Sequence, residues 1–203
     1  MTLTSFAIRQ CAASLVVGLF VASPLGASPQ SDPKDDYAAV QEFTARAEAY
    51  AAMHRRLAAS LPLLGPSLDR HTLLISRTFL SAAIRSAKPS LRQGDIFTPA
   101  AARIVRGVLL DALDEGDLDT FALPMDEEGR MLAGVHPRIY DPFPAWETSE
   151  LPASVVFLLP TLPEELEYRI ADYDLVIWDV YADLVVDVLP YGIAHPISDE
   201  MFR

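Results

Sequence analysis

The chain has 203 residues, enough for one domain with a hydrophobic core of its own. It carries 28 acidic and 16 basic side chains, and its formal net charge is −12. An acidic surface of this kind disfavours nucleic acid and anionic lipid as partners.

The first 27 residues have the pattern of a secretory signal peptide. A single charge, Arg9, precedes the apolar run "CAASLVVGLFVASPLGA". Pro24 and Gly26 interrupt this run before it reaches the roughly 20 residues of a membrane-spanning helix, which is the alternative interpretation. We expect cleavage after Ala27 and export, to the periplasm rather than the medium, with membrane contact only before cleavage. Loss of Cys11, the only cysteine, would then exclude a disulfide scaffold, a thiolate metal site and a cysteine nucleophile.

Helices are expected within residues 37–114, after a disordered leader at residues 28–36. Between Asp35 and Leu61, apolar residues recur at spacings of three and four, beginning at Tyr37, and His54 falls in the same stripe. This spacing predicts a helix with one buried face.

Two further helices follow from their start and stop signals. Ser67 is a suitable N-cap for a helix that ends near Ala87, where "KPS" interrupts it. Thr98 and Pro99 are a typical N-cap and first residue of a third helix, which should end near Leu113. Three helices are therefore predicted before any strand.

A proline-rich connection is expected over residues 130–163, with one short strand at 130–135, because its prolines remove backbone donors. Residues 153–159 are ambiguous between helix and strand, and we favour helix. Strands are then expected over residues 166–189, with a tight turn near Asp172 and Tyr173. The predicted fold is α+β, with about three N-terminal helices packed on a small C-terminal antiparallel sheet or hairpin.

The segment from Val176 to Val188 alternates with a period of two and is rich in valine, which predicts a strand with its even positions buried. Asp179, Asp183 and Asp187 occupy odd positions and are expected on the solvated face; pairing with the basic helices is an alternative. A helix is the alternative, and it would bring neighbouring carboxylates close enough to share a divalent ion. On a strand, four residues span about 13 Å, so the three aspartates cannot hold one ion together.

No metal site, catalytic residue or cofactor is assigned from the sequence. Asp172 and Asp174 lie near the predicted turn and are weak candidates for calcium, although aspartates at turns usually bond to the local backbone. Ser67, Asp69 and His71 lie too close along one helix start to align as a catalytic triad. A histidine in an apolar stripe, such as His54, is typical of a hydrogen-bonded core residue. Histidines 136 and 195, each before a proline, remain unassigned.

The charges are unevenly distributed along the chain. Residues 28–106 hold seven acidic and eleven basic side chains, whereas residues 107–203 hold twenty-one acidic and four basic ones. This asymmetry favours docking of basic helices on the acidic strand half; a cationic partner is the alternative. Arg70, Arg77 and Arg85 form the basic stripe of the second predicted helix.

Three blocks of the sequence resemble blocks found, in the same order, in a group of exported bacterial proteins that has no assigned fold or reaction. The blocks are "YAAMHRRLAASLP", "GDIFTPAAARIVRGVL" and "LPTLPEELEYRIADYDLVIWDVYADLVVDVLP". The connection "RIYDPFPAWETSELP" departs from the group's pattern. The resemblance implies export and helices before strands, and it implies no activity.

These observations predict a non-enzymatic exported protein that acts as a binding or accessory module for a protein or small ligand. The alternative is a cofactor-independent hydrolase with dispersed carboxylates and His54 or His136 as base; a calcium-dependent structural protein is the third hypothesis. An enzyme should show a pocket in which a histidine and a carboxylate converge within hydrogen-bond reach. A binding module should expose an apolar or single-sign patch instead.

Overall fold

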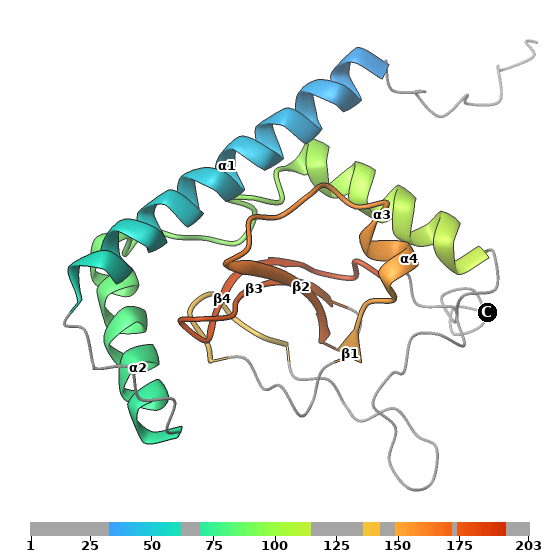
Figure 1. Cartoon of the computed structure of the whole chain (residues 1–203). Helices are drawn as coiled ribbons and strands as arrows, with labels where there is room; N and C mark the ends of the chain where they lie inside the picture. Colours follow the sequence, from blue (N-terminus) through green and yellow to red (C-terminus); the bar gives the residue numbers. More distant parts are fainter. Residues whose placement is uncertain (1–32, 62–69, 115–135, 143–148, 172–173, 194–203) are drawn as a thin grey trace, which may run out of the picture. The chain divides into compact units, whose positions relative to one another are not determined.

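The computed structural model describes residues 33–61, 70–114, 136–142, 149–171 and 174–193. The expected signal peptide, the strand at 130–135, Ser67, Asp172 and His195 lie outside these ranges. Helices in the N-terminal part pack against an antiparallel sheet in the C-terminal part, so the predicted α+β class is confirmed (Figure 1). No helix in the described ranges is long and apolar enough to span a membrane.

Helix α1 (Pro33–Ser60) begins inside the segment 28–36 that we expected to be a disordered leader. Asp35 and Asp36 lie in its first turn, where negative charge stabilises the helix dipole. Its buried residues recur at spacings of three and four and include Phe43 and His54. Tyr37 was expected in this stripe but is 68% exposed, because the buried face begins at Ala39.

The other helices follow the predicted boundaries closely. Helix α2 (Arg70–Ala87) and helix α3 (Pro99–Asp114) both contact other helices, α2 through α1 and α3 through α1 and α4. The N–H of Ala101 donates to the hydroxyl of Thr98, which confirms Thr98 as the N-cap of α3. Helix α4 (Ala153–Val156) is a single turn and confirms the helical interpretation for the first residues of 153–159.

The sheet has four antiparallel strands in the order β1 (Ser149–Glu150), β2 (Leu166–Ala171), β3 (Asp174–Asp179) and β4 (Leu184–Leu189). The last three lie within the span predicted for strands, 166–189. The segment from Val176 to Val188 is not one strand, however, since the chain reverses at residues 180–183. Asp183 has a left-handed φ of 55° in this turn, a conformation that aspartate tolerates better than most residues.

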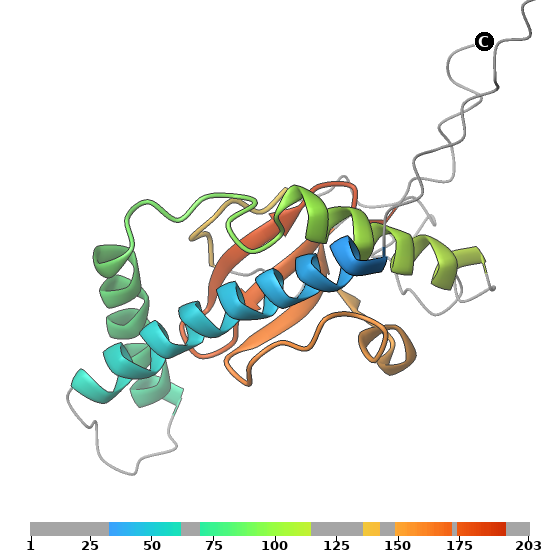
Figure 2. The ribbon, with the colours of Figure 1, turned by 90° about the horizontal axis from the view of Figure 1, so that it is seen from above.

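Both faces of β3 and β4 are buried, whereas the sequence predicted one buried face. Leu175 and Ile177 belong to the main core, which α1 and α3 help to form on one face of the sheet (Figure 2). Val176 and Val185 belong to a second cluster with Ile139 packed against it. A register shift at Ile177/Trp178 separates the two alternations.

The prediction that Asp179 and Asp187 face solvent is wrong, because both side chains are 0% exposed. Asp187 accepts backbone hydrogen bonds from Gly94, Ile96 and Phe97 at 2.7 Å each, and from Val188 at 2.8 Å. Burial raises the pKa of Asp187, and these four N–H donors oppose the rise. The loop between α2 and α3 therefore supplies three of the four bonds that make burial of this carboxyl group tolerable.

Candidate functional site

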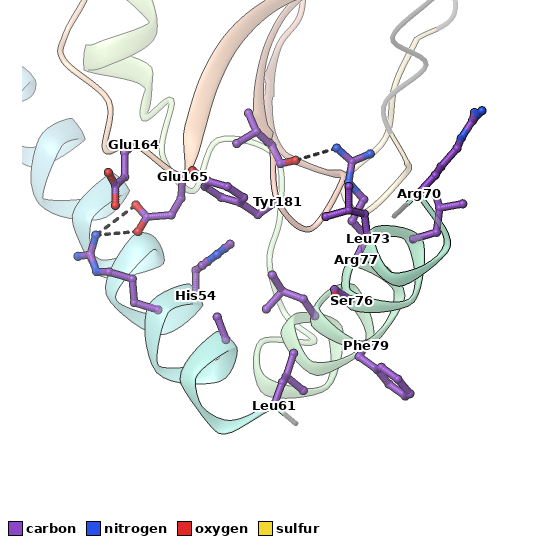
Figure 3. A pocket seen from close by; sticks show the side chains of 15 residues that line it. His54, Leu61, Arg70, Leu73, Ser76, Arg77, Phe79, Glu164, Glu165 and Tyr181 are labelled. Atoms are coloured by element: carbon purple, nitrogen blue, oxygen red, sulfur yellow. Dashed lines mark hydrogen bonds and ion pairs between the residues drawn. The ribbon is translucent and has the colours of Figure 1, made fainter. Parts of the chain in front are cut away.

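A pocket of about 860 Å³ lies between the C-terminal part of α1, the N-terminal part of α2 and the turn between β3 and β4. We call it the α1–α2 pocket. Its volume is in the range of small-molecule sites, which is roughly 300–1,000 Å³. His54 reaches it from α1, Leu61 from the position directly after α1, and Leu73 and Arg77 from α2 (Figure 3).

Helical spacing explains why these side chains meet. His54 and Ala58 are four residues apart and lie on one face of α1, and Leu61 directly follows the helix. Leu73, Arg77 and Leu80 are separated by four and three residues on α2. Each helix thus contributes a mixed apolar and basic face to the pocket.

His54 forms a buried hydrogen-bonded cluster with Asp179 and Tyr50. Nδ1 of His54 lies 2.7 Å from Oδ2 of Asp179, and the hydroxyl of Tyr50 donates to the same oxygen at 2.9 Å. The other oxygen, Oδ1, accepts from the backbone N–H of Tyr181 at 3.1 Å and of Ala182 at 2.8 Å. Both oxygens of Asp179 therefore have two partners each.

This cluster determines the tautomer of His54. The pKa of Tyr50 is raised by burial and by the neighbouring Asp179, so its hydroxyl stays protonated and donates. Asp179 accepts at both oxygens, as an ionised carboxylate does, so Nδ1 of His54 must carry a proton and donate it. A neutral His54 then has its lone pair on Nε2.

Nε2 of His54 is the unused polar atom of the cluster. His54 is 4% exposed and lines the α1–α2 pocket, where its ring makes an edge contact with Tyr181 at 5.9 Å between centroids. Nε2 has no hydrogen-bond partner among the described residues, and it is not a fully buried atom, so it is accessible from the pocket. The histidine and the carboxylate thus converge at a pocket, the arrangement expected of an enzyme, although Asp179 also has a structural role in the turn.

A second buried carboxylate, Glu165, lies at the wall of the pocket and is paired with Arg55. Nη1 of Arg55 donates to both carboxylate oxygens, at 3.0 and 3.1 Å (Figure 3). This hydrogen bonding raises the pKa of Arg55. The charge of Arg55 is therefore largely matched within the protein.

Arg77 and Arg70 are less engaged than Arg55. Nη2 of Arg77 donates to the carbonyl of Val180 at 3.3 Å (Figure 3), and Nη1 lies 3.8 Å from Oδ2 of Asp183. Within the part of the chain that the structure describes, Arg70 makes no hydrogen bond or ion pair. Of these two arginines on the α2 side of the pocket, Arg77 lies near a carboxylate, and Arg70 has no carboxylate partner among the described residues.

The other residues considered from the sequence lie elsewhere. Oδ1 of Asp174 accepts from the N–H of Tyr191 at 2.9 Å, and its Oδ2 lies 3.2 Å from Nδ1 of His136. Asp172 lies outside the described residues, which contain no group of three or more side chains able to hold a metal ion. His71 is exposed on α2 and does not line the pocket.

Sequence analysis missed Asp179 as the partner of His54. A usable signal was present, because Tyr50 and His54 are polar residues four apart on the buried face of one helix. Buried polar atoms need partners, so this spacing indicates a carboxylate or carbonyl opposite α1. The pairing of Arg55 with Glu165, 110 residues away, had no comparable local signal.

The comparisons with known proteins return no relative: no family model, no curated protein and no solved structure matches the chain. The functional argument therefore rests on the geometry of the α1–α2 pocket.

Proposed function

We propose that this protein is an exported, periplasmic binding module that holds a small amphipathic anion in the α1–α2 pocket. The observation that carries this proposal is the combination of apolar walls with Arg70, which has no partner among the described residues. A ligand with an apolar body and one anionic group matches both features.

The apolar part of the ligand would cover leucine side chains that are exposed to solvent in the free protein. Leu73 and Leu74 line the pocket and are 49% and 52% exposed. Removing apolar surface from water contributes roughly 25 cal/mol per Å², so covering these side chains favours binding. This contribution to binding depends on the size and shape of the apolar part of the ligand and not on the ligand's charge.

The anionic group would bind the α2 side of the pocket. The chain as a whole has a net charge of −12, so its surface repels anions in general. Arg70 and Arg77 provide a local exception beside the leucines. Guanidinium groups bind carboxylates and sulfonates through paired hydrogen bonds, which makes the anion specific to this place.

Two fluorescent probes of similar apolar size test this proposal: 8-anilinonaphthalene-1-sulfonate carries a sulfonate, and N-phenyl-1-naphthylamine does not. We expect Arg70→Gln to weaken sulfonate binding about tenfold, the loss of one charge-assisted contact of about 1.4 kcal/mol. Binding of the neutral probe should not change. The control is Arg92→Gln, which removes an exposed arginine outside the pocket. Equal sulfonate binding by the Arg70→Gln and Arg92→Gln variants would contradict the proposal.

Export is tested separately from binding. Expression of the full chain in a Gram-negative host, followed by release of the periplasm, should give a protein whose amino terminus is Ser28. A protein that stays in the cytoplasm with residues 1–27 attached would refute export and leave the pocket argument unaffected.

A second candidate function, cofactor-independent hydrolysis, is favoured by the contact between His54 and Asp179. Nε2 of a neutral His54 could take a proton from water as the water oxygen bonds to an acyl carbon. The proton would then pass to the departing alcohol as the ester bond breaks. Hydrolysis of p-nitrophenyl esters should be lost in His54→Asn and kept in His71→Asn; equal rates in both variants would rule this function out.

A further inference from the structure

The side chain of His54 is largely buried, but its Nε2 atom is accessible from the α1–α2 pocket and has no hydrogen-bond partner among the described residues. The imidazole ring is held by Asp179 on its Nδ1 edge and contacted by Tyr181. The ring therefore cannot turn to place Nδ1 in the pocket without breaking a buried hydrogen bond. Nε2 is the atom left for a ligand.

The tautomer determines what Nε2 can accept. Nδ1 carries a proton and donates a hydrogen bond to Asp179. Nε2 of a neutral imidazole therefore has a lone pair and accepts a hydrogen bond. A buried acceptor without a partner is costly, by about 1–3 kcal/mol when water is excluded. A ligand that fills the pocket with apolar groups alone would impose this cost, and a ligand with a correctly placed donor would not.

The acceptor and the unpaired cation come from different helices. His54 projects from α1 beside Tyr181, whereas Arg70 lies on α2 beyond Leu73, and its side chain extends outward at the rim of the pocket, away from His54 (Figure 3). A single ligand that engages both must carry two polar groups separated by an apolar body.

We infer that the ligand of this pocket is a hydroxylated amphipathic carboxylate, whose hydroxyl donates to Nε2 of His54 and whose carboxylate binds Arg70. The inference rests on the proposed binding function and narrows its ligand class. An N–H donor would satisfy His54 in the same way, so the shared chemistry is a hydrogen-bond donor attached to an apolar acid.

The test compares three acids with the same chain length: dodecanoate, 3-hydroxydodecanoate and 12-hydroxydodecanoate. We expect at least one hydroxy acid to bind the wild-type protein about fivefold more tightly than dodecanoate, as measured by calorimetry, which corresponds to one net hydrogen bond. Equal affinity of all three acids overturns the inference. Failure of all three to bind overturns the proposed function itself.

The variant His54→Asn separates the ligand role from the structural role. The amide of asparagine occupies the place of Nδ1 and still donates to Asp179, but it has no atom at the place of Nε2. We expect the hydroxy acid and dodecanoate to bind this variant with equal affinity, so that the advantage of the hydroxy acid is lost. The control, His71→Asn on the exposed side of α2, should keep that advantage. Persistence of the advantage in His54→Asn overturns the inference.

A second measurement covers the case in which His54→Asn does not fold. In wild-type protein labelled with ¹⁵N-histidine, the hydroxy acid should shift the Nε2 resonance of His54, whereas dodecanoate should not. A shift of the same size with both acids, or with neither, contradicts a hydrogen bond from the hydroxyl.

Discussion

His54 and Asp179 are 125 residues apart in the chain, yet Nδ1 of the first lies 2.7 Å from Oδ2 of the second. The same carboxylate accepts the backbone N–H groups of Tyr181 and Ala182 in the turn between β3 and β4. One side chain thus holds the turn in shape and fixes it to α1. The wall of the α1–α2 pocket depends on this connection.

Replacing Asp179 tests this dual role. In Asp179→Asn, an amide NH₂ replaces one of the two carboxylate oxygens. Whichever oxygen it replaces, the NH₂ then faces hydrogen-bond donors instead of accepting from them. We expect a loss of about 2–4 kcal/mol in the free energy of unfolding, measured with urea, because buried donors are left unpaired. Asp111→Asn, at an exposed position on α3, is the control and should change the stability by less than about 0.5 kcal/mol. Similar stability of the two variants would show that the cluster does not hold the turn.

Asp187 and Asp183 form a second contrasting pair on the β3–β4 hairpin. Asp187 is buried among four backbone N–H donors, whereas Asp183 is partly exposed in the turn. We expect Asp187→Asn to lower the free energy of unfolding by about 2–4 kcal/mol, since two N–H groups then face an amide donor. Asp183→Asn should cost less than about 1 kcal/mol, because asparagine also tolerates a left-handed φ. Equal losses in the two variants would contradict this explanation.

That residues 166–189 form strands was predictable from the sequence, because alternation and valine content are local properties, but the turn at residues 180–183 was missed. The burial of the Asp179 and Asp187 side chains was not predictable, because their hydrogen-bond partners are distant in the sequence. Asp179 is satisfied by Tyr50 and His54 on α1, and Asp187 by the loop at Gly94 to Phe97, all about 90 residues or more away. A period-two pattern assigns polar residues to solvent because it contains no information about distant donors.

The pocket had the same limitation. The amphipathic faces of α1 and α2 could be predicted from spacing alone, and the burial of His54 agrees with its place in the apolar stripe. Tertiary contacts decide which helix faces meet. They also place the turn at Val180 and Tyr181 so that it closes the space between the two helices. Local signals therefore gave the elements, and the candidate site came only from their packing.

Two glycines provide a test of packing away from the pocket. A Cβ atom built on Gly192 would lie 2.8 Å from Cβ and 3.1 Å from the backbone N of Leu175, so we expect Gly192→Ala to lower the free energy of unfolding by about 1–3 kcal/mol. A Cβ on Gly107, within α3, meets nothing within 4 Å. Gly107→Ala should raise the free energy of unfolding by about 0.5–1 kcal/mol, through helix propensity. Urea denaturation measures whether the free energy of unfolding rises or falls in each variant. A lower free energy of unfolding in Gly107→Ala would contradict the packing of α3.

The basic stripe of α2 docks on the acidic strand half only in part, because Arg77 is its one arginine that lies near a carboxylate of the described residues. Arg85 donates to the carbonyl of Tyr140 at 2.7 Å, and Arg77 donates to the carbonyl of Val180 with Asp183 nearby. Only Arg77 therefore combines a charge contact with a carbonyl contact. Arg70 makes neither within the described residues.

Because Arg70, Arg77 and Arg85 have different partners, substituting each of them distinguishes an effect on folding stability from an effect on ligand binding in the α1–α2 pocket. Arg77→Glu and Arg85→Glu each place a carboxylate beside a carbonyl oxygen, so we expect each to lower the free energy of unfolding by more than about 1 kcal/mol. Arg70→Glu should change stability by less than about 0.5 kcal/mol and still abolish the preference for the sulfonate probe over the neutral one. Urea denaturation and probe titration on the same three variants measure both effects. If Arg70→Glu loses as much stability as Arg77→Glu, Arg70 has a structural partner, and its assignment to ligand binding fails.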